Sequence, residues 1–144
     1  MKVFRQAGIR TIRVPFYWES YERNRQVFFN DLFNVLENAS INNLQVILDN
    51  HLWVTGSWLG LGIGFPNYVL SVYYHMGSGQ PNYDHVRDWY RFWGRTARDI
   101  QDRDVWKLQA EFLKEVVTLT TNHTAAIAHE LLNEPEVWRK ADYF

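Results

Sequence analysis

Three short apolar segments, separated by helical patterns, constrain the fold of this chain more than any other feature of its sequence. They cover residues 9–14, 44–48 and 126–132 and are rich in aliphatic and β-branched side chains. Apolar residues at helical spacing occupy 30–43, between the first two segments, and two further helical patterns lie within 86–116. Strands that alternate with helices pair in parallel through right-handed crossovers. The sequence therefore predicts an α/β fold with a parallel sheet.

The boundaries of these elements are marked by residues with strong backbone preferences. Gly8 follows a short helical turn and predicts a helix end, because glycine takes positive φ angles freely. Pro15 is expected to end the first strand, since proline has no amide hydrogen for a ladder. The polar and aromatic segment 16–29 is predicted to be a loop, and Asn30 or Asp31 is expected to cap the helix that follows. Asn42 and Asn43 are expected to close this helix.

Polar side chains stand in or directly after each predicted strand. Arg13 is a charge within the first strand, His51 follows the second, and Asn133 and Glu134 follow the third. Barrels and open sheets of the α/β class place their sites at the carboxyl ends of parallel strands. Pro135 biases Glu134 toward an extended backbone, so we expect this carboxyl to project from the rim. Glu134 is therefore a candidate general acid or base.

Composition narrows the range of partners. The chain has 144 residues, a formal net charge of −1 and 47% apolar residues, which fits one globular domain and argues against binding dominated by phosphate neutralisation. It has no run of about eighteen apolar residues, so no membrane span is predicted. Aromatic residues make up 17%, which suits binding to sugars or peptides. Cysteine is absent, so neither disulfides nor a thiolate metal site are expected.

Three motifs in this order resemble glycoside hydrolase family 5, the cellulase family of the TIM-barrel glycosidases. They are GIRTIRVP at 8–15, LQVILDNH at 44–51 and ELLNEP at 130–135. The resemblance implies an α/β fold that is a partial (β/α)8 TIM barrel, with these segments as strands two to four and their helices. Residues 1–144 are then a fragment of a single catalytic domain, with an insertion at about 52–103, because a complete barrel needs on the order of 200 to 250 residues.

The resemblance also assigns roles to residues at the strand ends. Glu134 matches the acid/base of the family, and Asn133 matches the residue that hydrogen-bonds the 2-hydroxyl of the sugar. His51 matches a histidine that lines the site of the cleaved sugar, and Arg13 matches the arginine that supports the catalytic carboxylates. The alternative for Glu134 is a non-catalytic role as a solvated acid in a turn.

Other residues have competing interpretations. Arg13 is also expected to pair with a structural acid such as Asp49 or Glu130. Trp18 and Trp53 lie in predicted loops on the active face, where we expect sugar-stacking platforms, with loop packing as the alternative. Three further tryptophans belong to predicted helices and are expected in the core: Trp89, Trp93 and Trp106.

The function implied by the resemblance is hydrolysis of O-glycosyl bonds in β-linked polysaccharides or oligosaccharides. A retaining double displacement needs two carboxyls about 5 to 5.5 Å apart, and no cofactor or metal. The nucleophilic glutamate of the family lies on the seventh strand, outside this sequence, so the chain alone is expected to be inactive. A carbohydrate is the expected substrate, and nucleic acid is not expected as a partner. The chain itself leaves the localisation open, and the family resemblance implies a parent enzyme outside the cell. The oligomeric state and the glycan are left open.

Two other function classes compete with this hypothesis. The first is a non-catalytic carbohydrate-binding or structural fragment, in which the aromatic residues bind or pack and Glu134 does no chemistry. The second is a zinc hydrolase, suggested by residues 129–133, which approach the HExxH motif. Asn133 stands where the second histidine ligand must be, so the zinc hypothesis ranks well below the others.

Overall fold

The computed structural model describes residues 1–52, 65–66 and 85–133. These residues form a sheet of three strands, β1 (Thr11–Phe16), β2 (Gln45–Asn50) and β3 (Ala126–Glu130), in the spatial order β1-β2-β3. Both strand pairs are parallel. The predicted parallel α/β arrangement is therefore confirmed for the described part of the chain.

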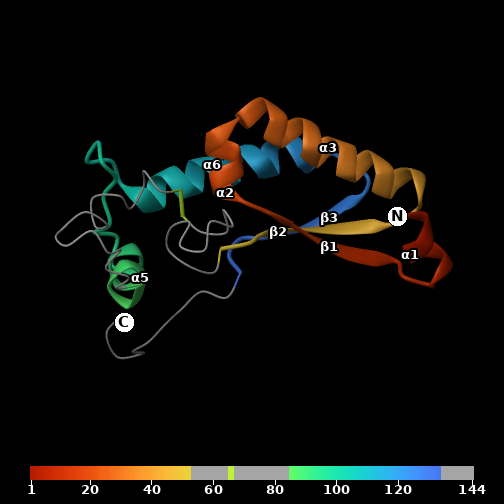
Figure 1. Ribbon diagram of the computed structural model, residues 1–144, viewed down its shortest axis with the longest axis horizontal. Helices are drawn as coiled ribbons and strands as arrows, with labels where there is room; N and C mark the ends of the chain where they lie inside the picture. The colour runs from red at the N-terminus through yellow and green to blue at the C-terminus, as the bar shows by residue number, and fades with distance from the viewer. Residues whose placement is uncertain (53–64, 67–84, 134–144) are drawn as a thin grey trace, which may run out of the picture.

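Helices occupy the connections between the strands. Helix α1 (Lys2–Gln6) precedes β1, and α2 (Trp18–Arg23) and α3 (Arg25–Ile41) join β1 to β2. Helices α5 (His85–Trp93) and α6 (Val105–Thr120) precede β3. In Figure 1, α3 and α6 lie over the same face of the sheet. None of the helices within the described ranges is both long and apolar enough to cross a bilayer.

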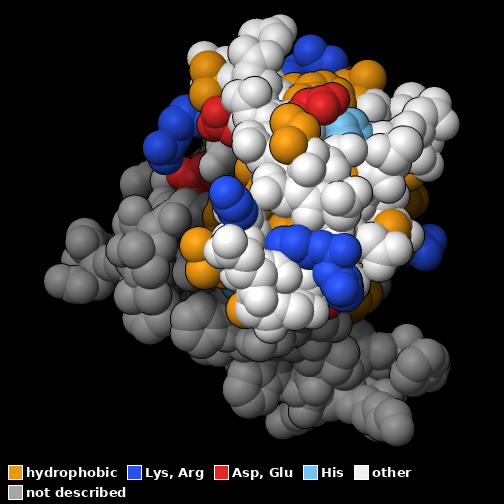
Figure 2. All heavy atoms as spheres, turned by 90° about the vertical axis from the view of Figure 1, so that its right-hand side faces the viewer, with side chains coloured by type: hydrophobic (Ala, Val, Ile, Leu, Met, Phe, Trp, Pro, Cys, Tyr) orange, Lys and Arg blue, Asp and Glu red, His pale blue; other side chains and the backbone are white. Residues whose placement is uncertain are grey.

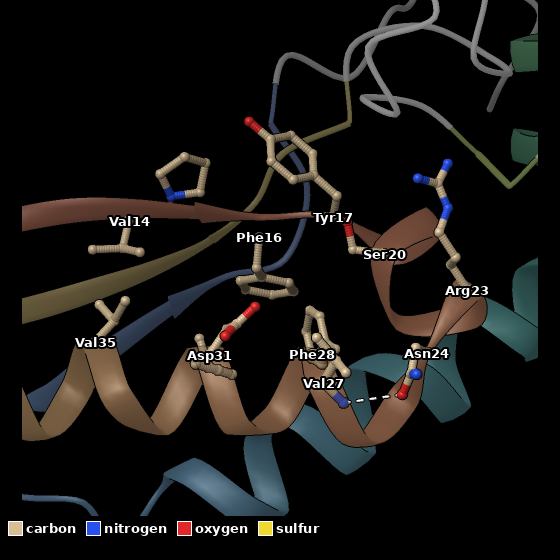
Figure 3. A pocket seen from close by; sticks show the side chains of 12 residues that line it. Val14, Phe16, Tyr17, Ser20, Arg23, Asn24, Val27, Phe28, Asp31 and Val35 are labelled. Atoms are coloured by element: carbon tan, nitrogen blue, oxygen red, sulfur yellow. Dashed lines mark hydrogen bonds between the residues drawn. The ribbon is translucent and has the colours of Figure 1, made fainter.

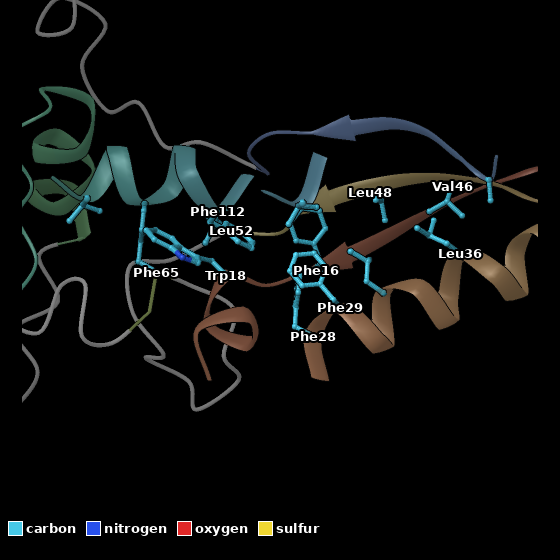
Figure 4. Close-up of a cluster of buried hydrophobic side chains, with 14 of the residues drawn as sticks. Phe16, Trp18, Phe28, Phe29, Leu36, Val46, Leu48, Leu52, Phe65 and Phe112 are labelled. Atoms are coloured by element: carbon cyan, nitrogen blue, oxygen red, sulfur yellow. The ribbon is translucent and has the colours of Figure 1, made fainter. Parts of the chain in front are cut away.

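The hydrophobic core fills the space between the sheet and these two helices. Val46 and Leu48 alternate along β2 and meet Leu36 of α3, and all three are fully buried. At the carboxyl end of the sheet the core becomes aromatic, with Phe16 packed edge to face against Phe112 of α6 at 5.8 Å between ring centroids. Figure 4 shows this cluster between the strands and the helices.

The other face of the sheet carries charge. Side chains alternate along a strand, so the residues between those of the core point to the face away from α3 and α6. The register pairs Pro15 with Asp49 and Asp49 with Glu130, and Arg13 lies two residues before Pro15 on the same face. The end of the molecule where the strands begin faces the viewer in Figure 2. This end shows only small, scattered groups of charged and hydrophobic side chains.

The expectation that Pro15 ends the first strand is wrong. Strand β1 continues through Pro15 to Phe16, whose carbonyl oxygen accepts a hydrogen bond from the His51 amide at 3.0 Å. The Arg10 carbonyl oxygen likewise accepts from the Gln45 amide, so the even-numbered residues of β1 bond to β2. The missing amide hydrogen of Pro15 therefore faces the outer edge of the described sheet, where it breaks no bond to β2.

The expected loop over 16–29 is also wrong, because α2 and the first turn of α3 occupy most of it. The cap of α3 is Asn24, whose Oδ1 accepts a hydrogen bond from the Val27 amide at 3.0 Å, rather than Asn30 or Asp31. The second strand extends past its expected end at 48 to include Asp49 and Asn50. The third strand ends at Glu130, two residues earlier than expected.

Other predicted boundaries are confirmed. Gly8 has a φ angle of 84° directly after α1, and α3 ends at Ile41, where Asn42 is the cap and Asn43 has a φ angle of 52°. Trp89 is fully buried as expected, whereas Trp93 is 37% exposed.

Candidate active site

Arg13 is the centre of a polar cluster that joins the three strands. Its Nε donates to Glu130 Oε2 at 2.7 Å and its Nη2 donates to Glu130 Oε1 at 2.9 Å, which makes a two-point contact with β3. Nη2 also donates to Asn133 Oδ1 at 2.6 Å and lies 3.2 Å from Asp49 Oδ1 on β2. Both acids named as alternative partners of Arg13 are thus its partners, and so is Asn133.

The electrostatics of this cluster fix the charge of Glu130. The hydrogen bond from Arg13 holds the pKa of the Glu130 carboxyl below its ordinary value. Desolvation acts in the opposite direction, and the positive charge of Arg13 adds to the lowering, as does His51 when its ring is protonated. Glu130 is therefore the ionised partner of Arg13 and is poorly suited to donate a proton during a reaction.

His51 joins the cluster through Asp49. The Nδ1 atom of His51 lies 2.7 Å from Asp49 Oδ2, and the Asp49 side chain is only 1% exposed. The His51 side chain is 30% exposed, so part of it faces solvent. The Tyr17 ring packs edge to face against the imidazole at 5.9 Å between centroids. His51 thus presents a partly open ring that is held by a buried carboxylate and an aromatic neighbour.

Asn50 fixes the chain that follows β3. Its Nδ2 donates to the Leu131 carbonyl oxygen at 2.8 Å, and its own carbonyl oxygen accepts from the Asn133 amide at 3.1 Å. Both Asn50 and Asn133 are buried. The end of β2 therefore holds residues 131–133 by their backbone, while Arg13 of β1 holds the Asn133 side chain.

The structure brings together three of the six residues expected at the site from sequence: Arg13, His51 and Asn133. Glu134 and Trp53 lie outside the described residues. Asp49, Asn50 and Glu130 complete the cluster but were not among the six. A sequence signal for Asp49 existed, because residues two apart on a strand share a face, and Asp49 precedes His51 by two.

The interpretation of Trp18 as a sugar platform is not supported. Trp18 begins α2 and is fully buried, with its ring stacked on Phe112 at 5.9 Å and an interplanar angle of 8°. Phe65 packs edge to face against the Trp18 ring at 5.8 Å between centroids. The Nε1 atom of Trp18 donates to Glu22 Oε1 at 3.0 Å. A ring enclosed in this way offers no face to a sugar, which favours the alternative, packing.

A cavity of about 390 Å³ lies apart from the polar cluster. Figure 3 shows it between β1 and the helices α2 and α3, with Val14, Val27 and Val35 among its apolar lining. Two lining residues, Phe16 and Tyr17, touch His51 of the cluster: the Phe16 carbonyl oxygen accepts from its amide, and the Tyr17 ring packs against its imidazole. None of the charged residues of the cluster, Arg13, Asp49, His51 and Glu130, lines this cavity, and we place the candidate site at the strand ends. No group of three or more potential metal ligands gathers within residues 1–52, 65–66 and 85–133.

A known protein family matches nearly all of this chain. The family model described as cellulase (glycosyl hydrolase family 5) matches residues 1–141. No curated protein and no solved structure gives a match. Since the family match covers nearly all of its 144 residues, the chain belongs to the cellulase family, glycosyl hydrolase family 5.

Proposed function

We propose that this chain contributes the acid/base half of a retaining active site that hydrolyses O-glycosyl bonds in β-linked polysaccharides or oligosaccharides. Membership of a glycoside hydrolase family supports the reaction class. The observation that carries the residue assignment is the 2.6 Å hydrogen bond from Arg13 Nη2 to Asn133 Oδ1. This bond fixes the residue next to Glu134 at the carboxyl ends of the strands, where α/β enzymes place their catalytic groups.

Asn133 is proposed to bind the substrate. Because its Oδ1 accepts from Arg13, its amide nitrogen is the atom left to donate a hydrogen bond to a sugar hydroxyl. The Asn50 carbonyl oxygen holds the Asn133 backbone, so the side chain starts from a fixed position. Hydrogen bonds to the 2-hydroxyl strengthen in the transition state of glycoside hydrolysis, which makes a rigid donor useful there.

Glu134 is proposed as the acid/base. Its carboxylic acid protonates the leaving-group oxygen while a second carboxylate attacks the anomeric carbon and forms a glycosyl ester. Glu134, now ionised, then removes a proton from water, which attacks the same carbon and releases the second carboxylate. Glu130 is a poor alternative for this role, because Arg13 keeps its pKa low.

The second carboxylate is proposed to come from outside these 144 residues. We propose that β1, β2 and β3 are strands two to four of an eight-stranded barrel, and that the chain is a fragment of one catalytic domain with an insertion at about 52–103. The described strands are parallel and carry their charged cluster on the face away from the helices, which is compatible with a barrel interior. On this proposal the chain alone is inactive.

His51 and Trp53 are proposed to contact the sugar at the cleaved bond. His51 supports this assignment by its partly exposed ring beside Asp49 and Tyr17. The assignment of Trp53 rests on its position in the sequence, two residues after His51. Aromatic rings at such positions stack on the apolar faces of sugar rings.

Product stereochemistry tests the proposed reaction. The full-length enzyme would be incubated with β-linked glucan, mannan and xylan oligosaccharides, and the first anomer released would be followed by proton NMR. A retaining mechanism predicts that the β-anomer of the product forms first and then mutarotates. Initial release of the α-anomer would overturn the retaining mechanism. Binding of these glycans without hydrolysis would favour the non-catalytic alternative.

A further inference from the structure

Asp49 is a carboxylate with almost no solvent exposure and two basic neighbours. It lies in the central described strand, where its Oδ2 is 2.7 Å from His51 Nδ1 and its Oδ1 is 3.2 Å from Arg13 Nη2. Burial of a carboxylate is costly unless nearby charges and hydrogen bonds compensate for the lost hydration. The contact of Oδ1 with Arg13 is an ion pair without hydrogen-bond geometry. Within the described residues, the Asp49 side chain therefore has a hydrogen bond only to His51.

The chemistry of the pair determines where the imidazole carries its proton. An ionised carboxylate can only accept hydrogen bonds, so the Nδ1 atom of His51 must be the donor. In the neutral ring the other nitrogen, Nε2, then has a lone pair and accepts. The His51 amide also donates to the Phe16 carbonyl oxygen at 3.0 Å, and Tyr17 packs edge to face on the ring, so both backbone and ring have fixed neighbours.

We propose that Asp49 is a positioning residue that holds His51 in the Nδ1–H tautomer, so that Nε2 accepts a hydrogen bond from a sugar hydroxyl. This inference rests on the proposed function, since it specifies what His51 does for the substrate. It makes His51 selective for a hydroxyl that donates, and it leaves Asn133 to donate to another oxygen of the sugar. At the strand ends, His51 thereby accepts a hydrogen bond from the sugar and Asn133 donates one to it.

A second buried aspartate shows what a purely structural carboxylate looks like in this protein. Asp99, between α5 and α6, is 2% exposed and accepts from the backbone amides of Gln101 and Arg103 at 2.9 and 2.8 Å. Arg103 Nε also donates to it at 2.7 Å. These bonds close a loop. The Asp49 carboxylate, in contrast, accepts from no backbone amide within the described residues and instead contacts two side chains of the candidate site.

The first test uses the unaltered full-length enzyme. Long-range 1H–15N NMR correlations of the neutral His51 ring distinguish its two tautomers. The proposal predicts the Nδ1–H form. Detection of the Nε2–H form would overturn the proposal, whatever the folding of any variant.

The second test compares Asp49→Asn with Asp99→Asn in the same enzyme. Loss of a hydrogen bond to a charged group corresponds to roughly a tenfold or larger change in an equilibrium constant. We expect Asp49→Asn to raise KM about tenfold with a smaller effect on kcat, because ground-state binding is lost. Asp99→Asn should lower the melting temperature without changing KM. An Asp49→Asn enzyme that loses stability but keeps its KM would show a merely structural role.

A double-mutant cycle separates this inference from the catalytic proposal. If Asp49 acts through His51, Asp49→Asn should raise KM much less in a His51→Ala background than alone. Additive effects would overturn the positioning role. If Glu134→Gln kept full activity while the NMR showed the Nδ1–H tautomer and the cycle showed coupling, the acid/base assignment would fail and the Asp49 assignment would stand.

Discussion

Arg13 Nη2 lies 2.6 Å from Asn133 Oδ1, although 120 positions separate the two residues in the chain. The same guanidinium makes two hydrogen bonds to Glu130. One arginine on β1 therefore orients both the last residue of β3 and the asparagine that follows it. The position next to Glu134 is set by a side chain from the far edge of the described sheet, so substitutions of Arg13 should affect both stability and catalysis.

Replacement of Arg13 by methionine should destabilise the protein. The change leaves the buried Asp49 carboxylate without its charge partner and removes the donor to Glu130 and Asn133. Removing one member of a buried ion pair costs about 3–5 kcal/mol, but the Arg13 side chain is 44% exposed, so we expect a loss of about 1–3 kcal/mol. Urea denaturation followed by tryptophan fluorescence would measure it.

Arg23→Met is the matched control for this experiment. Arg23 pairs with Glu19 one turn away on α2 and its side chain is 77% exposed. Exposed pairs of this kind contribute about 0.3–0.5 kcal/mol. Equal losses of unfolding free energy in the two variants would show that the Arg13 cluster has no special energetic role.

Acidification should weaken the contribution of Glu130 to stability. Its pKa in the folded protein lies below the ordinary value of 4.5, chiefly because Arg13 donates a hydrogen bond to it. A carboxyl with a lowered folded pKa stabilises the fold fully above its unfolded value and loses this contribution as the pH falls through the folded value. The difference in unfolding free energy between wild type and Glu130→Gln should therefore be largest at neutral pH and shrink below pH 4.5. A difference that stayed constant with pH would contradict this assignment.

Trp18→Ala should destabilise the hydrophobic core and should not remove a sugar-binding group. The ring is fully buried between Phe112 and Phe65, and removal of a buried tryptophan side chain costs about 3–5 kcal/mol. Trp93→Ala, at a 37% exposed position, should cost less. Trp18→Phe keeps an aromatic ring at this core position. For this variant, isothermal titration with an oligosaccharide substrate should give the wild-type affinity. A large loss of affinity in a folded Trp18→Phe protein would restore the sugar-platform interpretation.

Sequence patterns predicted the elements whose signal is local. The strands are predictable because apolar runs of five to seven residues stand between helical patterns, and Gly8 and Asn43 mark helix ends through their backbone preferences. Helix α2 was missed because six residues of mixed aromatic and charged character show no helical period, and its formation depends on burying Trp18. Whether a tryptophan faces a sugar or a phenylalanine depends on partners such as Phe112, which are remote in sequence.

The site was predictable in part for similar reasons. The sequence predicts that Arg13 needs a carboxylate but leaves Asp49 and Glu130 as alternatives. The register places the two acids side by side, and the side-chain distances show that Arg13 contacts both. The role of Asn50 in fixing residues 131–133 depends on a backbone carbonyl and could not be read from residue types.

Glu134→Gln in the full-length enzyme tests the central claim most directly, with Glu136→Gln as the neighbouring control. For a natural β-linked glycan, whose leaving group needs protonation, kcat/KM should fall about 10²–10⁴-fold. For an aryl glycoside with an acidic leaving group the loss should be much smaller. Added azide should restore turnover and form a β-glycosyl azide, because azide attacks the glycosyl ester without a general base. Wild-type kcat/KM of Glu134→Gln on the natural glycan would contradict the account.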